Sequence, residues 1–184
     1  MAEAATATAK LPQLQNLIKR DPEGYAEDFE RQHRHFLSEL QIFRLDPSKQ
    51  KAESFGALVT FLSHVAACYP VQCRQFPAQL TELIRKHGRV LHPGIRLTVL
   101  QALLLLRNRG LLQALDLFPL LFEVMEVQDK AMRQLAYSHM VSDLRKMHGS
   151  GSGGGGGGNS KVMREVQQFV CATVSGVQPS AMER

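Results

Sequence analysis

Three side chains have the chemistry to bind a metal ion, namely His64, Cys68 and Cys73. His64 and Cys68 are one helical turn apart, so both would lie on the same face of a helix. Structural zinc sites need tetrahedral sets of ligands in recognisable pairs, and no fourth ligand accompanies these three. We therefore interpret all the cysteines, including Cys171, as reduced, partly buried thiols of a cytosolic or nuclear protein. We expect neither a metal nor a cofactor.

Histidines and carboxylates offer no catalytic arrangement. His33 and His35 alternate along a predicted helix and point in nearly opposite directions, so we expect both at the surface. His87 and His139 continue apolar helix faces, which predicts core histidines. No Ser-His-Asp or Cys-His set can be defended, and no pair of carboxylates stands in apolar surroundings. The sequence therefore predicts that the protein is not an enzyme.

Basic residues gather at the ends of the predicted helices. One interpretation is that cations are favourable there because each interacts with the negative end of the helix dipole, for roughly a few tenths of a kcal/mol. In a stacked array, the ends of alternate helices would instead lie along one edge and form a basic ridge for phosphates or acidic peptides. Both interpretations remain open. The candidate partner or RNA contacts, acting by charge complementarity and not by base readout, are Arg85, Lys86, Arg89, Arg107, Arg109, Arg145 and Lys146.

The composition is that of a globular protein. The chain has 184 residues, 44% of them hydrophobic, and a formal net charge of +5, which allows one domain with a core built mainly from aliphatic residues. The mild positive charge is compatible with a nucleic-acid or acidic-protein partner. The most apolar run, residues 99–106, is less than half of the ~20 residues that a membrane-spanning helix needs. We expect a soluble protein.

The elements that position these side chains are predicted to be helices, because start and stop signals recur and strand signals are nearly absent. Asp21-Pro22 is a good N-cap and first-turn pair, and the helix that follows it ends at Asp46-Pro47. Pro93 begins the helix with the most apolar surface, and Gly110 ends it. The other helices are expected at 13–20, 51–69, 76–87, 116–127, 130–147 and 161–174.

Two of these helices resemble each other at a fixed offset. Placing Arg96 on Arg133 superimposes similar apolar positions 37 residues apart (133 − 96). A period of this size, built from helix pairs, is typical of repeat proteins. The sequence therefore predicts an all-α, HEAT/armadillo-like α-solenoid of about eight helices. The hairpins are expected to pair 51–69 with 76–87, 93–109 with 116–127, and 130–147 with 161–174.

The predicted domain organisation has one folded domain. It comprises residues 11–148 and a last helix at 160–175, with disordered ends at 1–10 and 176–184. Between them, 149–159 is expected to be a flexible glycine-rich loop, which lacks the Lys and Ser/Thr of a phosphate-binding loop. The last hairpin has no successor to cover it, so we expect the chain to be truncated.

Several blocks of the sequence resemble the SDA family, named for severe depolymerisation of actin. Residues 11–22, LPQLQNLIKRDP, are similar to the family's N-terminal signature. Later blocks follow in the family's order, namely Cys68-Tyr69-Pro70, Phe76-Pro77, the run LLLRN at 104–108, and Asp129-Lys130 with Arg133. The resemblance covers roughly residues 11–173. Family members are several times longer, and the glycine run replaces what is usually a short Lys/Asn-rich connection.

The resemblance implies a non-enzymatic factor for large ribosomal subunit biogenesis and nuclear export. Such proteins are nuclear and nucleolar, and their helical repeats dock on pre-ribosomal particles, so assembly proteins and rRNA phosphates are the expected partners. No membrane or small-molecule substrate is expected. The alternative is a protein–protein scaffold in actin cytoskeleton organisation or protein transport, without RNA contact. Salt dependence of binding separates the two.

Overall fold

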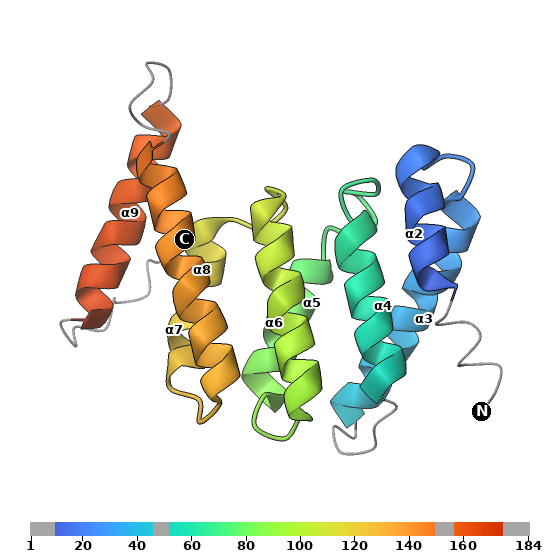
Figure 1. Cartoon of the computed structure of the whole chain (residues 1–184), viewed down its shortest axis with the longest axis horizontal. Helices are drawn as coiled ribbons and strands as arrows, with labels where there is room; N and C mark the ends of the chain where they lie inside the picture. Colours follow the sequence, from blue (N-terminus) through green and yellow to red (C-terminus); the bar gives the residue numbers. More distant parts are fainter. Residues whose placement is uncertain (1–9, 46–51, 150–156, 175–184) are drawn as a thin grey trace. The chain divides into compact units, whose positions relative to one another are not determined.

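The computed structural model describes residues 10–45, 52–149 and 157–174, and these ranges form helices joined by turns and contain no strand (Figure 1). The all-α prediction and its approximate number of helices are therefore confirmed. The tail, most of the glycine run and the C-terminal end that we expected to be disordered lie outside the described residues. The helices are α2 (Leu11–Arg20), α3 (Ala26–Leu45), α4 (Ala52–Val65), α5 (Phe76–His87), α6 (Pro93–Asn108), α7 (Ala114–Met125), α8 (Lys130–Gly149) and α9 (Gly157–Val174).

The chain divides into two compact units, an N-terminal unit (Met1–Leu112) and a C-terminal unit (Gln113–Arg184). None of the described helices is long and apolar enough to cross a membrane. Helices α8 and α9 include Gly149 and Gly157, which we had placed in the glycine-rich loop.

The 37-residue repeat appears in the way α6 and α8 begin. His92 caps α6 by accepting from the backbone N–H of Gly94 at 3.2 Å, and Asp129 caps α8 by accepting from that of Met132 at 3.2 Å. One turn later, Arg96 donates to the carbonyl oxygen of Gly88 at 3.0 Å, and Arg133 donates to that of Val127 at 3.2 Å. In both helices a polar cap and an arginine therefore tie the first turn to the preceding connection.

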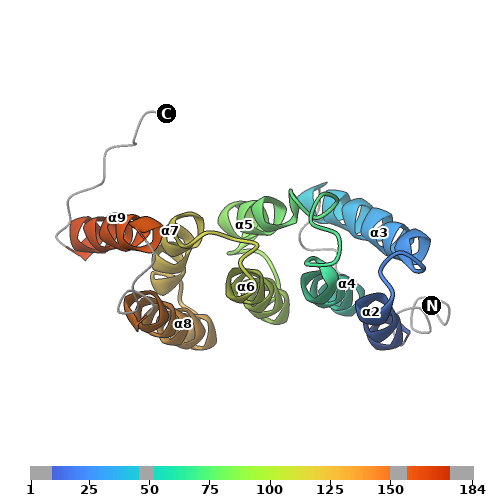
Figure 2. The same ribbon diagram turned by 90° about the horizontal axis from the view of Figure 1, so that it is seen from above.

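The N-terminal unit has two layers of helices. Helices α2, α4 and α6 form one layer, and α3 and α5 form the other (Figure 2). Helix α4 packs against α2, α3 and α6, whereas α5 packs against α6. The predicted pairing of 51–69 with 76–87 is therefore wrong. The short connection at 88–92 makes α5 and α6 the hairpin, whereas the longer connection at 66–75 carries the chain onward from α4. The pairing of 93–109 with 116–127 spans the two units and stays a prediction.

An aromatic cluster fills the space between α3, α4 and α5. The ring of Phe36 stacks on Phe55, with centroids 5.8 Å apart, and meets the edge of Phe76 at 5.1 Å. Phe29 stacks on Tyr69 at 3.9 Å. His33 stacks on Phe29 at 5.6 Å and is half-buried. The expectation that His33 lies at the surface is therefore correct only for part of the side chain, because its ring extends the aromatic cluster.

Helices α7, α8 and α9 build the C-terminal unit. Helix α7 packs against both α8 and α9, and α8 also contacts α9. Phe118 and Leu121 of α7 and Met132 and Ala136 of α8 are buried, and Phe122 of α7 meets Phe169 of α9 with ring centroids 5.7 Å apart. The predicted hairpin pairing of 130–147 with 161–174 is therefore confirmed only as a contact between α8 and α9, because α7 is the main partner of α8.

Candidate partner-binding surface

The cations predicted as contacts in the N-terminal unit lie at opposite ends of one hairpin. Arg85 and Lys86 are in the last turn of α5, and Arg89 follows it. Arg107 and Arg109 are at the end of α6, whose 16 residues span ~24 Å. Because α5 and α6 are antiparallel, these two sets do not form one ridge within this unit. Arg145 and Lys146 are exposed near the end of α8 in the other unit, so a ridge that includes them stays a prediction.

The arginines at the end of α6 are half-buried and bonded to backbone. Nη1 of Arg109 donates to the carbonyl oxygen of His64 at 2.5 Å, and Nη2 lies 3.5 Å from Nδ1 of the same residue. Nη1 of Arg107 donates to the carbonyl oxygen of Leu112 at 3.4 Å. Arg109 thus satisfies a carbonyl at the end of α4, where the helix itself offers no donor. It holds the ends of α4 and α6 together.

His64 is held in an environment that disfavours its charged form. Burial lowers the pKa of His64, and the positive charges of Lys19 and Arg109 lower it further. Nη2 of Arg109 can donate to Nδ1 only while Nδ1 carries no proton. His64 is therefore expected to be neutral at pH 7.

The opposite end of the N-terminal unit combines the ends of α3 and α5. Glu82 bridges them, because its Oε2 is 2.6 Å from Nη2 of Arg44 and its Oε1 is 2.7 Å from Nζ of Lys86. A hydrogen bond from Lys86, with the charges of Arg44 and Lys86, lowers the pKa of Glu82. Arg44 was not among the predicted contacts, although it is a cation in the last turn of its helix like the others.

Two large apolar side chains are exposed at this same end. Leu45, the last residue of α3, is 87% exposed, and Val90, in the turn after α5, is 60% exposed. The backbone N–H of Val90 donates to the carbonyl oxygen of His87 at 2.9 Å, which keeps the turn against the helix end. We call this surface the α3–α5 end, defined by Arg44, Leu45, Glu82, Arg85, Lys86, Arg89 and Val90.

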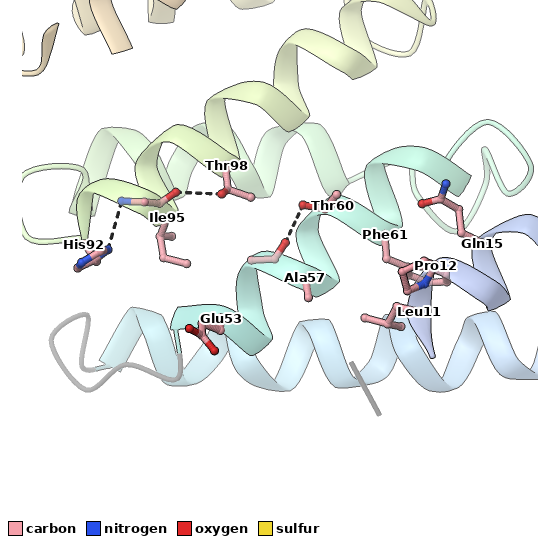
Figure 3. Close-up of a pocket in the computed structure, with 12 residues that line it drawn as sticks. Leu11, Pro12, Gln15, Glu53, Ala57, Thr60, Phe61, His92, Ile95 and Thr98 are labelled. Carbon is pink, nitrogen blue, oxygen red and sulfur yellow. Dashed lines mark hydrogen bonds between the residues drawn. The ribbon is translucent and has the colours of Figure 1, made fainter. Parts of the chain in front are cut away.

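A pocket of about 530 Å³ lies on the other layer of the same unit, between α2, α4 and α6 (Figure 3). Thr60 and Thr98 line it, and their hydroxyls donate to the backbone carbonyl oxygens of Gly56 and Gly94 in their own helices, each at 2.9 Å (Figure 3). Glu53 and His92 are the titratable side chains of the lining. This arrangement provides no activated nucleophile.

The cysteines differ in their surroundings. Burial, with a smaller effect of Cys68, raises the pKa of Cys73 to about 12, so this thiol is protonated at physiological pH. Cys68 is half-buried and Cys171 is exposed, so the expectation of partial burial is wrong for Cys171. Within the part of the chain that the structure describes, no three His, Cys, Asp or Glu side chains gather as a metal site.

Comparison with known proteins places this helical arrangement in context. A family model described as SDA1, HEAT repeat matches residues 61–183. The chain is 39% identical over 171 residues to the Protein SDA1 homolog of Drosophila melanogaster, covering 93% of this chain and 23% of that protein. It is 41% identical over 164 residues to the Protein SDA1 homolog of Xenopus tropicalis, covering 89% of this chain and 23% of that protein. Against Protein sda1 of Schizosaccharomyces pombe, the identity is 28% over 174 residues. The chain spans about a quarter of the length of these relatives.

Proposed function

The chain belongs to the SDA1 family of HEAT-repeat proteins, and on that premise we propose that it is a docking module in large ribosomal subunit biogenesis and nuclear export. It would act without enzymatic chemistry, in the nucleus and nucleolus. Its partner would be the pre-large-subunit particle, through assembly proteins and rRNA phosphates. The observation that carries a docking role is the α3–α5 end, where exposed cations gather at the ends of two helices that the ion pairs of Glu82 join.

The docking mechanism we propose is charge complementarity. Arg85, Lys86 and Arg89 project from the end of α5 with exposed side chains. Such contacts position a partner without reading its sequence. Arg107 and Arg109 would contribute indirectly, because their guanidinium groups are bonded to backbone carbonyls within the fold. Arg145 and Lys146 would provide a separate set of contacts on α8.

A second candidate is a protein–protein scaffold in actin cytoskeleton organisation or protein transport. The exposure of Leu45 and Val90 favours it, because apolar surface of this kind is covered by proteins more readily than by phosphates. The two candidates differ in their response to salt. Binding through RNA phosphates weakens steeply between low and moderate salt, whereas an apolar contact does not.

The experiment that tests the proposal is recovery of the tagged chain from nuclear extract at moderate salt, with identification of the co-purified proteins and RNA. Large-subunit precursor proteins and rRNA in the eluate would support docking by this part of the protein. Cytoskeletal or transport proteins without rRNA would favour the second candidate. A folded but solitary chain would contradict both.

A further inference from the structure

The α3–α5 end is one joined surface and not two separate helix ends. Both helices lie in the same layer (Figure 2), and the carboxylate of Glu82 on α5 is bonded to Arg44 on α3 and to Lys86 on α5. Leu45 follows Arg44 directly, and Val90 follows Arg89. The ion pairs of Glu82 and the turn after α5 fix the positions of these cations. The exposed apolar side chains are their neighbours in the sequence.

The charge of this surface is positive. Arg44, Arg85, Lys86 and Arg89 supply four cations, and Glu82 supplies one carboxylate that is already shared by two of them. Among the residues that the structure describes, Glu53 in the first turn of α4 is a further carboxylate of this unit. An acidic ligand would therefore be attracted, and a basic one repelled.

The apolar side chains narrow the choice of ligand. Phosphates of an RNA backbone would pair with the cations but would leave Leu45 and Val90 in water. A protein segment that carries both carboxylates and aliphatic side chains would pair with the cations and also cover Leu45 and Val90. Protein interfaces combine apolar contacts and ion pairs in this way. Exposure of 87% and 60% leaves most of these two side chains available for burial in a complex.

We propose that the α3–α5 end binds an acidic protein segment that also carries aliphatic side chains. The inference rests on the proposed docking role and names the partner chemistry of one of its surfaces. Arg85, Lys86 and Arg89 pair with the carboxylates of the segment, and Leu45 and Val90 pack against its aliphatic side chains. Arg44 and Glu82 keep the two helix ends in register for that contact.

The test is fluorescence anisotropy of the full chain with three labelled probes of equal length. The first is a short peptide of Glu and Leu, the second has Ser in place of each Leu, and the third is oligouridine. The Glu/Leu peptide is expected to bind tightest. The variant Arg85→Glu/Arg89→Glu is expected to weaken it about tenfold or more. Leu45→Ser/Val90→Ser is expected to weaken it about fivefold and remove the preference over the Glu/Ser peptide.

A matched control reverses the charge of two exposed arginines outside this surface, in Arg20→Glu/Arg74→Glu. It is expected to change the affinity less than about twofold, because salt screens charges that lie more than about 10 Å from the ligand. Urea unfolding of every variant checks that the fold is retained. Tighter binding of oligouridine, equal losses in the control pair, or no peptide binding would overturn the inference. Recovery of precursor particles from nuclear extract is scored separately, so docking by another surface would leave the proposed function standing.

Discussion

Arg109 and His64 are 45 positions apart in the sequence, and Nη1 of Arg109 donates to the carbonyl oxygen of His64 at 2.5 Å. The bond joins the end of α6 to the end of α4. Sequence reasoning grouped Arg109 with the candidate partner contacts because it stands at a helix end. In the structure, a helix end is also where carbonyl oxygens without a partner in the helix are found, and Arg109 donates a hydrogen bond to one of them.

Replacing Arg109 should therefore affect stability more than an ordinary surface change would. Arg109→Ala removes a charged donor from a half-buried carbonyl, which we expect to cost about 1–2 kcal/mol of unfolding free energy. The control Arg89→Ala, at an exposed position, should stay within about 0.5 kcal/mol. Urea unfolding followed by circular dichroism measures both. Equal effects of the two substitutions would contradict the structural role of Arg109.

The pH dependence of stability should carry the signature of His64. Its pKa is lowered in the folded chain, so the unfolded chain binds a proton first as the pH falls below about 6.5. Stability is then complete above that pH and decreases below it, down to the folded pKa. His33, whose pKa burial also lowers, contributes with the same sign. His64→Gln should flatten part of the slope between neutral and mildly acidic pH, whereas an unchanged slope would show that His64 titrates normally.

Replacing either of two glycines with alanine should change the stability of the chain, in opposite directions for the two positions. A Cβ at Gly56 would meet Ile95 Cδ1 at 3.6 Å and Thr98 Cγ2 at 3.8 Å, which are ordinary contacts. Because alanine favours a helix, Gly56→Ala should stabilise the chain by about 0.5–1 kcal/mol. Gly110 has φ +74°, and the turn at Gly110 and Leu111 bonds back to the last carbonyls of α6. Gly110→Ala should cost about 1 kcal/mol. Thermal unfolding measures the change in stability of both variants. If both substitutions stabilised the chain, or both destabilised it, the backbone conformations assigned to the two glycines would be contradicted.

The cysteines should react in order of their surroundings. Cys171 is exposed, whereas the pKa of Cys73 is raised to about 12 and leaves almost no thiolate at mildly alkaline pH. Brief alkylation with iodoacetamide, followed by peptide mass spectrometry, should label Cys171 well before Cys73. The same reaction in urea should label both. Rapid labelling of Cys73 in the native chain would mean that this thiol is not buried.

Local helix signals predicted much of the fold. Pro93, Gly110 and Asp129 act through backbone geometry within a few residues, so the bounds of α6 and α8 could be predicted from them. The partners of each helix could not, because every apolar face in a repeat protein is compatible with either neighbour. The choice depends on how each connection directs the chain, and the hairpin partner of α5 was therefore assigned wrongly.

The α3–α5 end shows a similar limit for the candidate site. Clusters such as Arg85 and Lys86 are visible in the sequence, whereas a single Arg44 is not distinguished from any other helix-end cation. Leu45 is the last residue of α3 and lies two positions after Phe43, away from the buried face of that helix, and it is 87% exposed. Contacts between distant segments, such as Arg44 with Glu82, follow from the packing of whole helices.

The most direct test of docking compares the tagged chain with its Arg85→Glu/Lys86→Glu/Arg89→Glu variant in recovery from nuclear extract. Both are purified side by side with the Arg20→Glu/Arg74→Glu control, after urea unfolding has shown that all three are folded. We predict that co-purified large-subunit precursor proteins and rRNA fall about tenfold or more in the triple variant and stay near the original level in the control. Equal recovery by the triple variant and the original chain would contradict docking through the α3–α5 end.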